Sequence, residues 1–583
     1  MNALLLLVIA VAILVCGYIV YGNYLVKEWG VGTSKTETPA HTVDDGGVDY
    51  VPAKAPVLMG HHFSSIAGAG PITGPISALG LGFGWLPCLL WILIGGIFVG
   101  GVHDFGALFA SVRHGGKSIG EIISANMSKR AKRLFIIFSY MTLILVVAAF
   151  ASIVAGTFGT TTAAGAAAAN PDSNASVAMV SLLFIVIAII FGILVYRRNA
   201  PLGVSTVIGV VAIVLCMVIG MNFHPFYFTY KTWMIIVGIY IAVASVTPVW
   251  ILLQPRDYLS SFLLYAMLIL AVFAVIVCHP SLSALPVMQS EACTTPVFPV
   301  LFTTIACGAC SGFHSLVSSG TTSKQLDKEK DAKPIAYGGM LIECVLAVLT
   351  ICAVGFAYSY NAANPDSALT GATAIFAGGI AGMASSIAGG MGSPLYHVLY
   401  TMLVLTYSAF CLTSLDTATR LARFMFQEFW LDSSKGETPD NVTGAKKVLA
   451  NPYFATVLTV VLGVALGMTG YAKIWALFGS ANQLLAALGL LAVAAWLGNV
   501  GKKNFNVVIP MFFMLCVTIA SLIINTKTQL GVIMNGVTGA DGTVTPADWG
   551  PYAQVIIGII LVVMAVLLAI EGIVTIFGKK KAH

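Results

Sequence analysis

The sequence predicts an all-α polytopic membrane protein, and two observations lead to this class. The chain has 583 residues, of which 58% are hydrophobic and only 9% are charged, and its mean hydropathy is +0.93. Soluble domains carry about 25% charged residues. Apolar runs repeatedly reach the length that crosses a bilayer, and hydrocarbon accepts only helices or closed barrels. The alternating pattern of a barrel is absent, so we expect the crossings to be helices. The apolar runs correspond to about 15–16 transmembrane helices.

The apolar segments define the expected crossings in order. A further stretch rich in Gly, Ala and Ser, 374–393, is weakly hydrophobic, and we expect it to form a partly inserted helix. The fifteen clearer segments are 3–21, 58–80, 84–112, 134–158, 177–196, 202–221, 232–253, 258–278, 296–318, 335–358, 394–430, 452–470, 473–498, 505–524 and 552–577.

Lysine and arginine predict the orientation, because they concentrate in cytoplasmic loops. The loop after 84–112 carries six basic residues, and the basic turns at 196–200, 254–258, 323–333 and 501–504 fall on the same side when crossings are counted. This places loop 23–57 and the C-terminus in the cytoplasm and the N-terminus outside. The first segment lacks a basic n-region and a cleavage site, so we interpret it as a retained helix. The expected location is the cytoplasmic (inner) membrane.

Two crossings contain residues that disfavour a lipid-facing helix. Segment 58–80 includes GHHFSSIAGAGPITGP (60–75), with two histidines, four glycines and two prolines, and segment 296–318 includes ACGACSGFH (306–314). The count gives these crossings opposite orientations. Two interrupted helices that run in opposite directions are typical of inverted-repeat transporters, whose unwound backbone lines the substrate site near the midplane. A proline kink with close packing of small residues is the alternative.

The broken segments supply the predicted substrate site. Pro71 and Pro75 free backbone carbonyls, and the half-helix that begins near Pro71 directs its positive end toward the break, which suits a carboxylate. His61 and His62 point about 100° apart on a helix, so they form a poor metal pair, and a substrate or proton contact is the stronger interpretation. The predicted substrate-binding residues are His61, His62, Ala67, Gly68, Ala69, Gly70, Ala306, Gly308, Ser311 and His314.

Several motifs occur in order along most of the chain. They are GGVDYVP (46–52), GHHFSSIAGAGPITGP, HDF (103–105), TPVWILLQPRDYLSSF (247–262), ACGACSGFHSLVSSGTTSKQL (306–326), SLDTATRLARF (414–424) and LFGSANQLLAAL (477–488). Together they resemble the carbon starvation protein A (CstA) family.

The resemblance implies a bacterial or archaeal secondary transporter with a leucine-transporter-like core. It also implies import of peptides or of pyruvate, the latter coupled to protons. The expected organisation is an N-terminal extra helix and cytoplasmic loop (1–57), a transporter core with inverted repeats (58–500) and C-terminal extra helices (501–583). An Na⁺-coupled symporter of amino acids or carboxylates is the alternative within this class.

Intramembrane polar residues supply the predicted coupling site, since such residues are costly in lipid. The resemblance also implies a relation to the amino acid–polyamine–organocation superfamily, in which the crossing that holds the ion corresponds here to 394–430. This segment carries oxygen ligands suited to Na⁺ or a carboxyl suited to a proton. An architectural Asp416–Arg420 pair is the alternative. We expect His103 and Asp104 to bind an ion or to form a structural ion pair or gate. We expect Glu343 to act in a proton relay. The coupling candidates are Thr413, Ser414, Asp416, Thr417, His103, Asp104 and Glu343.

Other polar groups receive simpler interpretations. We interpret QPRDY (254–258) as a cytoplasmic turn or an internal gate, and Asn482 and Gln483 as interhelical hydrogen-bonding groups. Glu571, in the last helix, is expected to be structural. The expected partners are a small-molecule or peptide substrate, H⁺ or Na⁺ and the lipid bilayer, without nucleic acid.

An intramembrane metal or redox protein is a different class. Its support would be the histidines and Cys307–Cys310, but no second CxxC and no HExxH or GxSxG motif accompanies them. We therefore expect neither enzyme activity, a cofactor nor a metal. A channel is a third class, because glycine-broken helices also line pores.

Overall fold

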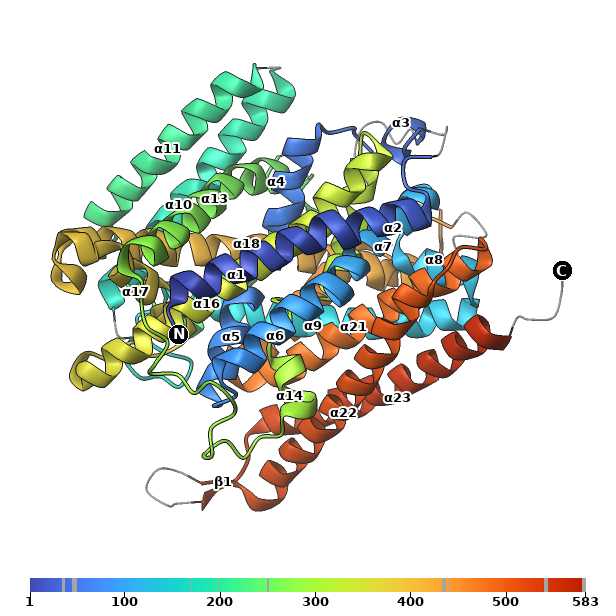
Figure 1. Ribbon diagram of the computed structural model, residues 1–583. Coiled ribbons are helices and arrows are strands. Elements are labelled where there is room, and N and C mark those ends of the chain that lie inside the picture. The colour runs from blue at the N-terminus through green and yellow to red at the C-terminus, as the bar shows by residue number, and fades with distance from the viewer. Residues whose placement is uncertain are drawn as a thin grey trace.

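A computed structural model describes the chain at residues 1–33, 37–43, 50–168, 170–198, 200–248, 251–431, 437–439, 441–538 and 544–578. The basic C-terminal tail, most of GGVDYVP and parts of loop 23–57 lie outside these residues. The helices form one bundle, with α22 and α23 paired along one side and α10 and α11 along another (Figure 1).

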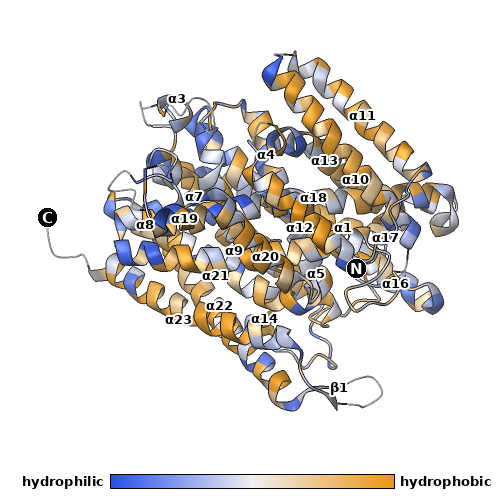
Figure 2. Ribbon diagram, turned by 180° about the vertical axis from the view of Figure 1, so that it is seen from behind, coloured by the Kyte–Doolittle hydropathy of each residue, from blue (hydrophilic) through white to orange (hydrophobic). Residues whose placement is uncertain are grey.

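Eleven helices within the described residues are long and apolar enough to cross a membrane. Together with α12, α20 and two broken helices, they account for the fifteen predicted crossings. Apolar residues cover the outward-facing helices such as α10, α11 and α23, whereas hydrophilic residues gather near α3 and α8 (Figure 2). The prediction of an all-α polytopic membrane protein is confirmed.

The elements follow one another along the chain, and π-helical segments join α1 to α2 and α6 to α7. A short hairpin pairs β1 with β2. The bounds are α1 (Ala3–Cys16), α2 (Gly22–Trp29), α3 (Pro39–Thr42), α4 (Ala55–Ile66), α5 (Gly70–Gly80), α6 (Trp85–Gly95), α7 (Gly101–Arg113), α8 (Ile119–Asn126), α9 (Lys129–Phe158), α10 (Pro171–Gly192), α11 (Leu202–Asn222), α12 (Tyr230–Val246), α13 (Leu253–Cys278), α14 (Val297–Thr304), α15 (Phe313–Gly320), α16 (Gly338–Ala363), α17 (Ala372–Ser385), α18 (Pro394–Trp430), α19 (Ala445–Leu449), α20 (Pro452–Gly467), α21 (Tyr471–Asn499), α22 (Phe505–Asn535), β1 (Val537–Thr538), β2 (Val544–Thr545) and α23 (Trp549–Gly578).

The core of the bundle is built on α9, α18 and α21. Helix α9 packs against α18 and α21. Helix α18 also contacts both broken helices, through α4 and α15, and α21 contacts the two halves of the second, α14 and α15. The most apolar 18-residue window of α21 is 94% buried, which separates it from the lipid-facing helices. Small residues allow this close packing. A Cβ atom at Gly463, for example, would lie 2.5 Å from the Val147 side chain, so α20 can approach α9 closely only because this position carries no side chain.

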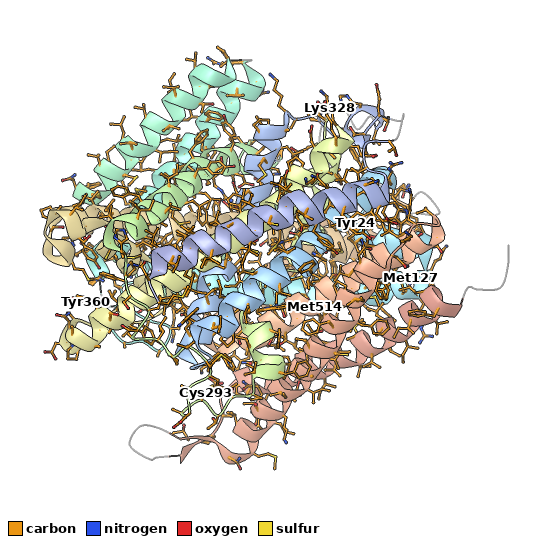
Figure 3. The ribbon with its side chains drawn as sticks, in the orientation of Figure 1. Tyr24, Met127, Cys293, Lys328, Tyr360 and Met514 are labelled. Carbon is orange, nitrogen blue, oxygen red and sulfur yellow. The ribbon has the colours of Figure 1, made fainter. Side chains whose placement is uncertain are left out.

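Loops predicted on the cytoplasmic side do meet at one end of the bundle. Arg113 Nη2 lies 2.8 Å from Glu329 Oε1, and Lys503 Nζ lies 3.7 Å from Glu28 Oε1. The loops poor in basic residues meet at the other end, where the backbone N–H of Ala3 donates to Pro280 O at 2.9 Å. In Figure 3, Lys328 and Met127 lie toward the first end, and Tyr360 and Cys293 toward the second.

Helix α17 corresponds to the weakly hydrophobic stretch 374–393. It has only 14 residues, and it packs between α13, α16 and α18. Its neighbours in sequence, α16 and α18, are long enough to cross a membrane. With the 3₁₀ turn that follows it, the apolar helix reaches Ala388 and is about as long as α12 and α20, so the partly inserted helix stays a prediction.

One helix end was predicted wrongly, and one open choice is narrowed. The first apolar segment was expected to end at residue 21, but the helix continues to Trp29 through an amphipathic stretch that includes Lys27 and Glu28. Of the two interpretations of QPRDY, the cytoplasmic turn is replaced by the first turns of α13, and the burial of Arg256 and Asp257 agrees with the internal gate. Pro255 is compatible with this position because the first helical turn needs no amide donor.

The grouping of loops at two ends can be tested by cysteine labelling. In intact cells, a membrane-impermeant maleimide is expected to label Asp366→Cys, in the loop before α17, but to label Lys503→Cys only after the cells are opened. The unsubstituted chain, with its 11 cysteines, gives the background. If intact cells were labelled at Lys503→Cys and not at Asp366→Cys, the predicted orientation would be wrong.

Candidate functional site

The first broken helix consists of α4 and α5, separated at residues 67–69. Helix α4 ends at Ile66, and Pro71 stands in the first turn of α5 with Pro75 inside it. Pro71 cannot donate a backbone hydrogen bond, and at the first turn of α5 none is needed, so its position favours a helix start here. A Cβ atom at Gly70 would collide with the side chain of Cys307, which explains why the chain needs glycine where the two broken helices meet.

The second broken helix consists of α14 and α15, separated at residues 305–312. Two side chains of α21 satisfy the backbone at this break. Asn482 Oδ1 accepts the backbone N–H of Phe313 at 2.9 Å, and Gln483 Nε2 donates to Phe302 O at 2.7 Å. Asn482 thus caps the start of α15, and Gln483 caps the end of α14. The prediction of interhelical hydrogen bonds is confirmed, and their targets are the broken backbone itself.

The two broken helices lie against each other and run in opposite directions. Helix α4 contacts α15, and α5 contacts α14. A Cβ atom at Gly74 would lie 3.0 Å from Thr304 O, and His62 Nδ1 lies 2.8 Å from Thr322 Oγ1 just beyond α15. The antiparallel arrangement that the sequence predicted is therefore present, and the two breaks face one another.

The space at the breaks is small in this conformation. A cavity of about 10 Å³ touches Gly68 of the first break and Cys307 and Ser311 of the second. This is about the volume that the centre of one water molecule requires. Phe150 and Phe478 close it from the side, with ring centroids 5.9 Å apart. The breaks are therefore closed in this conformation, with space at this cavity for no molecule larger than water.

A much larger cavity, which we call the vestibule, opens at the end of the bundle that carries the poorly basic loops. Its volume is about 790 Å³, and its wall includes Thr157 of α9, Lys231 of α12 and Tyr407 of α18. The Tyr407 hydroxyl lies 3.0 Å from Thr73 Oγ1 of α5. Tyr407 is thus shared between the vestibule and the first broken helix.

A chain of four buried ionisable residues, which we call the acid–histidine chain, joins α7, α15 and α16. Asp104 lies 2.7 Å from His103 Nδ1 through Oδ1 and 2.8 Å from His314 Nδ1 through Oδ2. His314 Nε2 lies 3.4 Å from Glu343 Oε2. All four side chains are fully buried. No arginine or lysine is among the partners recorded for these groups in the described residues, so protonation alone sets their net charge.

A second buried set, which we call the arginine cluster, joins α4, α12, α13 and α18. Arg256 donates to Asp416 Oδ2 and, at 2.6 Å, to the hydroxyl of Tyr240. Arg256 Nη2 also lies 3.4 Å from Asp257 Oδ1, and His61 Nδ1 lies 3.6 Å from Asp257 Oδ2. A buried charge is tolerated when it is paired and hydrogen-bonded, and here one guanidinium serves two carboxylates.

The structure separates the predicted site residues into three groups. His61 and Asp416 join the arginine cluster, whereas His314, predicted to contact substrate, joins His103, Asp104 and Glu343 instead. Ser414 Oγ lies 3.5 Å from Ser65 O beside the first break. The residues that line or flank the breaks are Ala67, Gly68, Ala69, Gly70, Ala306, Gly308 and Ser311.

Two features of the arginine cluster differ from the alternatives drawn from sequence. Asp416 pairs with Arg256 of another helix, while Arg420 Nη2 donates to Ala244 O at 2.8 Å. Spacing along α18 favoured an Asp416–Arg420 pair, because residues four apart lie on the same helical face. Arg256 was not among the predicted site residues, although the internal-gate interpretation of QPRDY agrees with its burial.

Comparison with known proteins identifies the family of the chain. The family model described as "Carbon starvation protein CstA" matches residues 2–375 and 359–521. The chain belongs to the CstA family. Among relatives, the peptide transporter CstA of Campylobacter jejuni is 33% identical over 89% of this chain and 79% of its own length.

Other CstA-family relatives are similar to the chain over comparable lengths. The peptide transporter CstA of Bacillus subtilis is 32% identical over 86% of this chain and 87% of its own. The pyruvate/proton symporter BtsT of Escherichia coli is 30% identical over 89% of this chain and 81% of its own. Among solved structures, the Eremococcus coleocola manganese transporter matches with a TM-score of 0.47 at 15% identity, covering 92% of this chain and 99% of its own.

The caps on the second break can be tested by Asn482→Ala. The substitution removes the acceptor for Phe313 N–H and the donor to Ser311 Oγ, so we expect the free energy of unfolding to fall by about 1–3 kcal/mol. Thermal unfolding in detergent measures the change. Asn222→Ala, which removes only a bond to Val218 O within its own helix, is the matched control. Equal unfolding temperatures for the two variants would contradict the capping role.

The arginine cluster can be tested by comparing single and double substitutions. Arg256→Met leaves Asp416 and Asp257 buried without their cation, so we expect a loss of about 3–5 kcal/mol. Adding Asp416→Asn removes one stranded charge and is expected to recover part of this loss. Arg113→Met, at a more exposed pair, should cost about 1 kcal/mol or less. Unfolding in detergent measures all three, and a double variant no more stable than Arg256→Met would contradict the pairing.

Proposed function

We propose that this chain is a secondary active importer that carries short peptides or pyruvate into the cell together with protons, by alternating access. The names of the CstA-family relatives support the substrate classes and the proton. The two facing breaks support the transport mechanism, because irregular backbone inside a membrane is tolerated only where protein or a cavity satisfies it.

The acid–histidine chain is the observation that carries the proton coupling. Each histidine presents Nδ1 to a carboxylate oxygen of Asp104, and His314 presents its second nitrogen to Glu343. An imidazole that gains a proton at Nε2 can release one at Nδ1. His314 Nε2 and the Glu343 oxygens are not hydrogen-bonded in this conformation, so a proton passes between α16 and α7 when these two side chains approach each other. Their protons belong to the set as a whole, because the groups interact strongly.

The position of His314 couples this proton to movement. His314 lies in the first turn of α15, directly after the second break. When the second broken helix moves, the His314 contacts to Asp104 and Glu343 change together. Protonation therefore favours one conformation over the other, and differential affinity of this kind is what a coupled transporter needs.

The arginine cluster serves as a gate in this proposal. It ties the first broken helix, through His61 and Asp257, to α18, through Asp416. Opening the protein between the first broken helix and α18 requires these contacts to separate. The cost of separating paired charges in a low-dielectric interior keeps the pathway closed until substrate and proton are bound.

Sodium coupling is the second candidate function, and one observation favours it. Asp416 Oδ1 and Thr417 Oγ1 are buried without a hydrogen-bond partner in the described part of the chain. Oxygen atoms of this kind are the ligands that hard cations prefer. Asp416 Oδ2 is, however, already bound to Arg256, which opposes a further positive charge at this carboxylate.

Uptake into proteoliposomes tests the proposal. With purified protein, we expect an inward proton gradient alone to drive accumulation of radiolabelled pyruvate or trialanine, and a protonophore to abolish it. Glu343→Gln is expected to lose gradient-driven accumulation by at least about tenfold while retaining exchange of substrate at equilibrium, because the relay ends at this carboxyl. Glu571→Gln, on another membrane helix, is the control. Accumulation driven by a sodium gradient alone would favour the second candidate.

A further inference from the structure

The vestibule is a large cavity that combines charge, polar groups and access from outside the bundle. Its lining includes Lys231, Lys473 and Asp548, together with Tyr400 and Tyr471. Cavities of about 300–1,000 Å³ with a few placed polar groups are typical of small-molecule sites. At about 790 Å³, the vestibule falls within this range.

The charges in the vestibule are arranged in two parts. Lys473 Nζ lies 3.0 Å from Asp548 Oδ2. Lys231 is exposed in the first turn of α12, and no ion pair or hydrogen bond of its side chain is found within the described residues. The vestibule therefore offers one cation that is free to bind an anion and one carboxylate, at Asp548, that is shared with Lys473.

The starts of several helices add to the positive potential. Residues from the starts of α10, α12, α17 and α21 line the vestibule. The N-caps of α17 and α21 are Gly371 and Gly470, which have no side chain to accept the first amide hydrogens. The positive ends of these helices favour an anion in the vestibule, in the same region as Lys231.

Size distinguishes between ligands that carry a carboxylate. The vestibule has a volume of about 790 Å³, and an extended peptide advances about 3.3–3.6 Å per residue, so it can hold a chain of a few residues. A tripeptide therefore matches the vestibule, whereas pyruvate, with three carbon atoms, would leave most of it to water. A peptide also carries an ammonium group, which can share the Asp548 carboxylate with Lys473, and pyruvate has none.

We propose that the vestibule is a binding site for a short zwitterionic peptide of about three residues, whose terminal carboxylate binds Lys231 above the closed breaks. This inference rests on the proposed importer function and narrows its substrate class. The floor of the site is Tyr407, which is hydrogen-bonded to Thr73 of the first broken helix. A peptide held there lies directly outside the helix that must move to admit it.

Equilibrium binding without any ion gradient tests the site, using titration calorimetry on the purified full chain. Trialanine is expected to bind the unsubstituted protein, and Lys231→Met should raise its dissociation constant about tenfold, as the loss of a charged hydrogen bond predicts. Trialanine amide, which lacks the carboxylate, should bind more weakly and be unaffected by Lys231→Met. Lys527→Met, which removes an exposed lysine of α22 outside the vestibule, should bind trialanine normally.

Three results would overturn the proposal: no trialanine binding, an unchanged dissociation constant in Lys231→Met, or pyruvate binding that is as tight as that of trialanine and equally sensitive to Lys231→Met. Proton-driven uptake measured on the same preparation separates this inference from the proposed function. Uptake of pyruvate without trialanine binding removes only the vestibule site. Trialanine binding without proton-driven uptake of either compound removes the importer and leaves the site.

Discussion

The structure depends on one constraint, which is that backbone groups freed by a helix break inside a membrane must find partners within the protein. The second break meets it through α21, where Asn482 binds Phe313 N–H and Gln483 binds Phe302 O. The first break is short and lies against the second. The two breaks are therefore fixed to each other and to α21, the most buried of the long helices.

The buried charges follow from the same low-polarity interior. The acid–histidine chain and the arginine cluster each contact one broken helix, through His314 of α15 and His61 of α4. They differ in composition, since one contains a permanent cation and the other does not. A set with a permanent cation holds elements together, whereas a set of carboxyls and imidazoles changes charge with its protons. We therefore assign gating to the arginine cluster and proton coupling to the acid–histidine chain.

The two cavities lie close to each other along α9 and are separated by packed side chains. The vestibule reaches Thr157 of α9 and Tyr407 of α18, and the cavity at the breaks touches Phe150 of α9. Less than two helical turns of α9 separate these residues. The Tyr407–Thr73 contact lies between the two spaces, so movement of α5 is the structural event that would join them.

The sequence by itself determined the class, the crossings and the two breaks. Hydropathy is a property of a single segment, and prolines and glycines act on their own backbone, so segment 58–80 and its partner 296–318 were identified without tertiary information. The same holds for the list of buried ionisable residues, because a charge within an apolar run has to face the protein interior. The ends of helices were predicted less accurately, because the first helix extends to Trp29 and QPRDY lies inside α13.

Only the tertiary structure decided which of these residues act together. Asp416 pairs with Arg256, 160 positions away, and His314 pairs with Asp104, 210 positions away, although spacing along one helix favoured Arg420 for the first. The vestibule likewise assembles from the starts of four helices that are far apart in the chain. Partners of this kind are set by how the helices pack, and the period of a single helix carries no information about that packing.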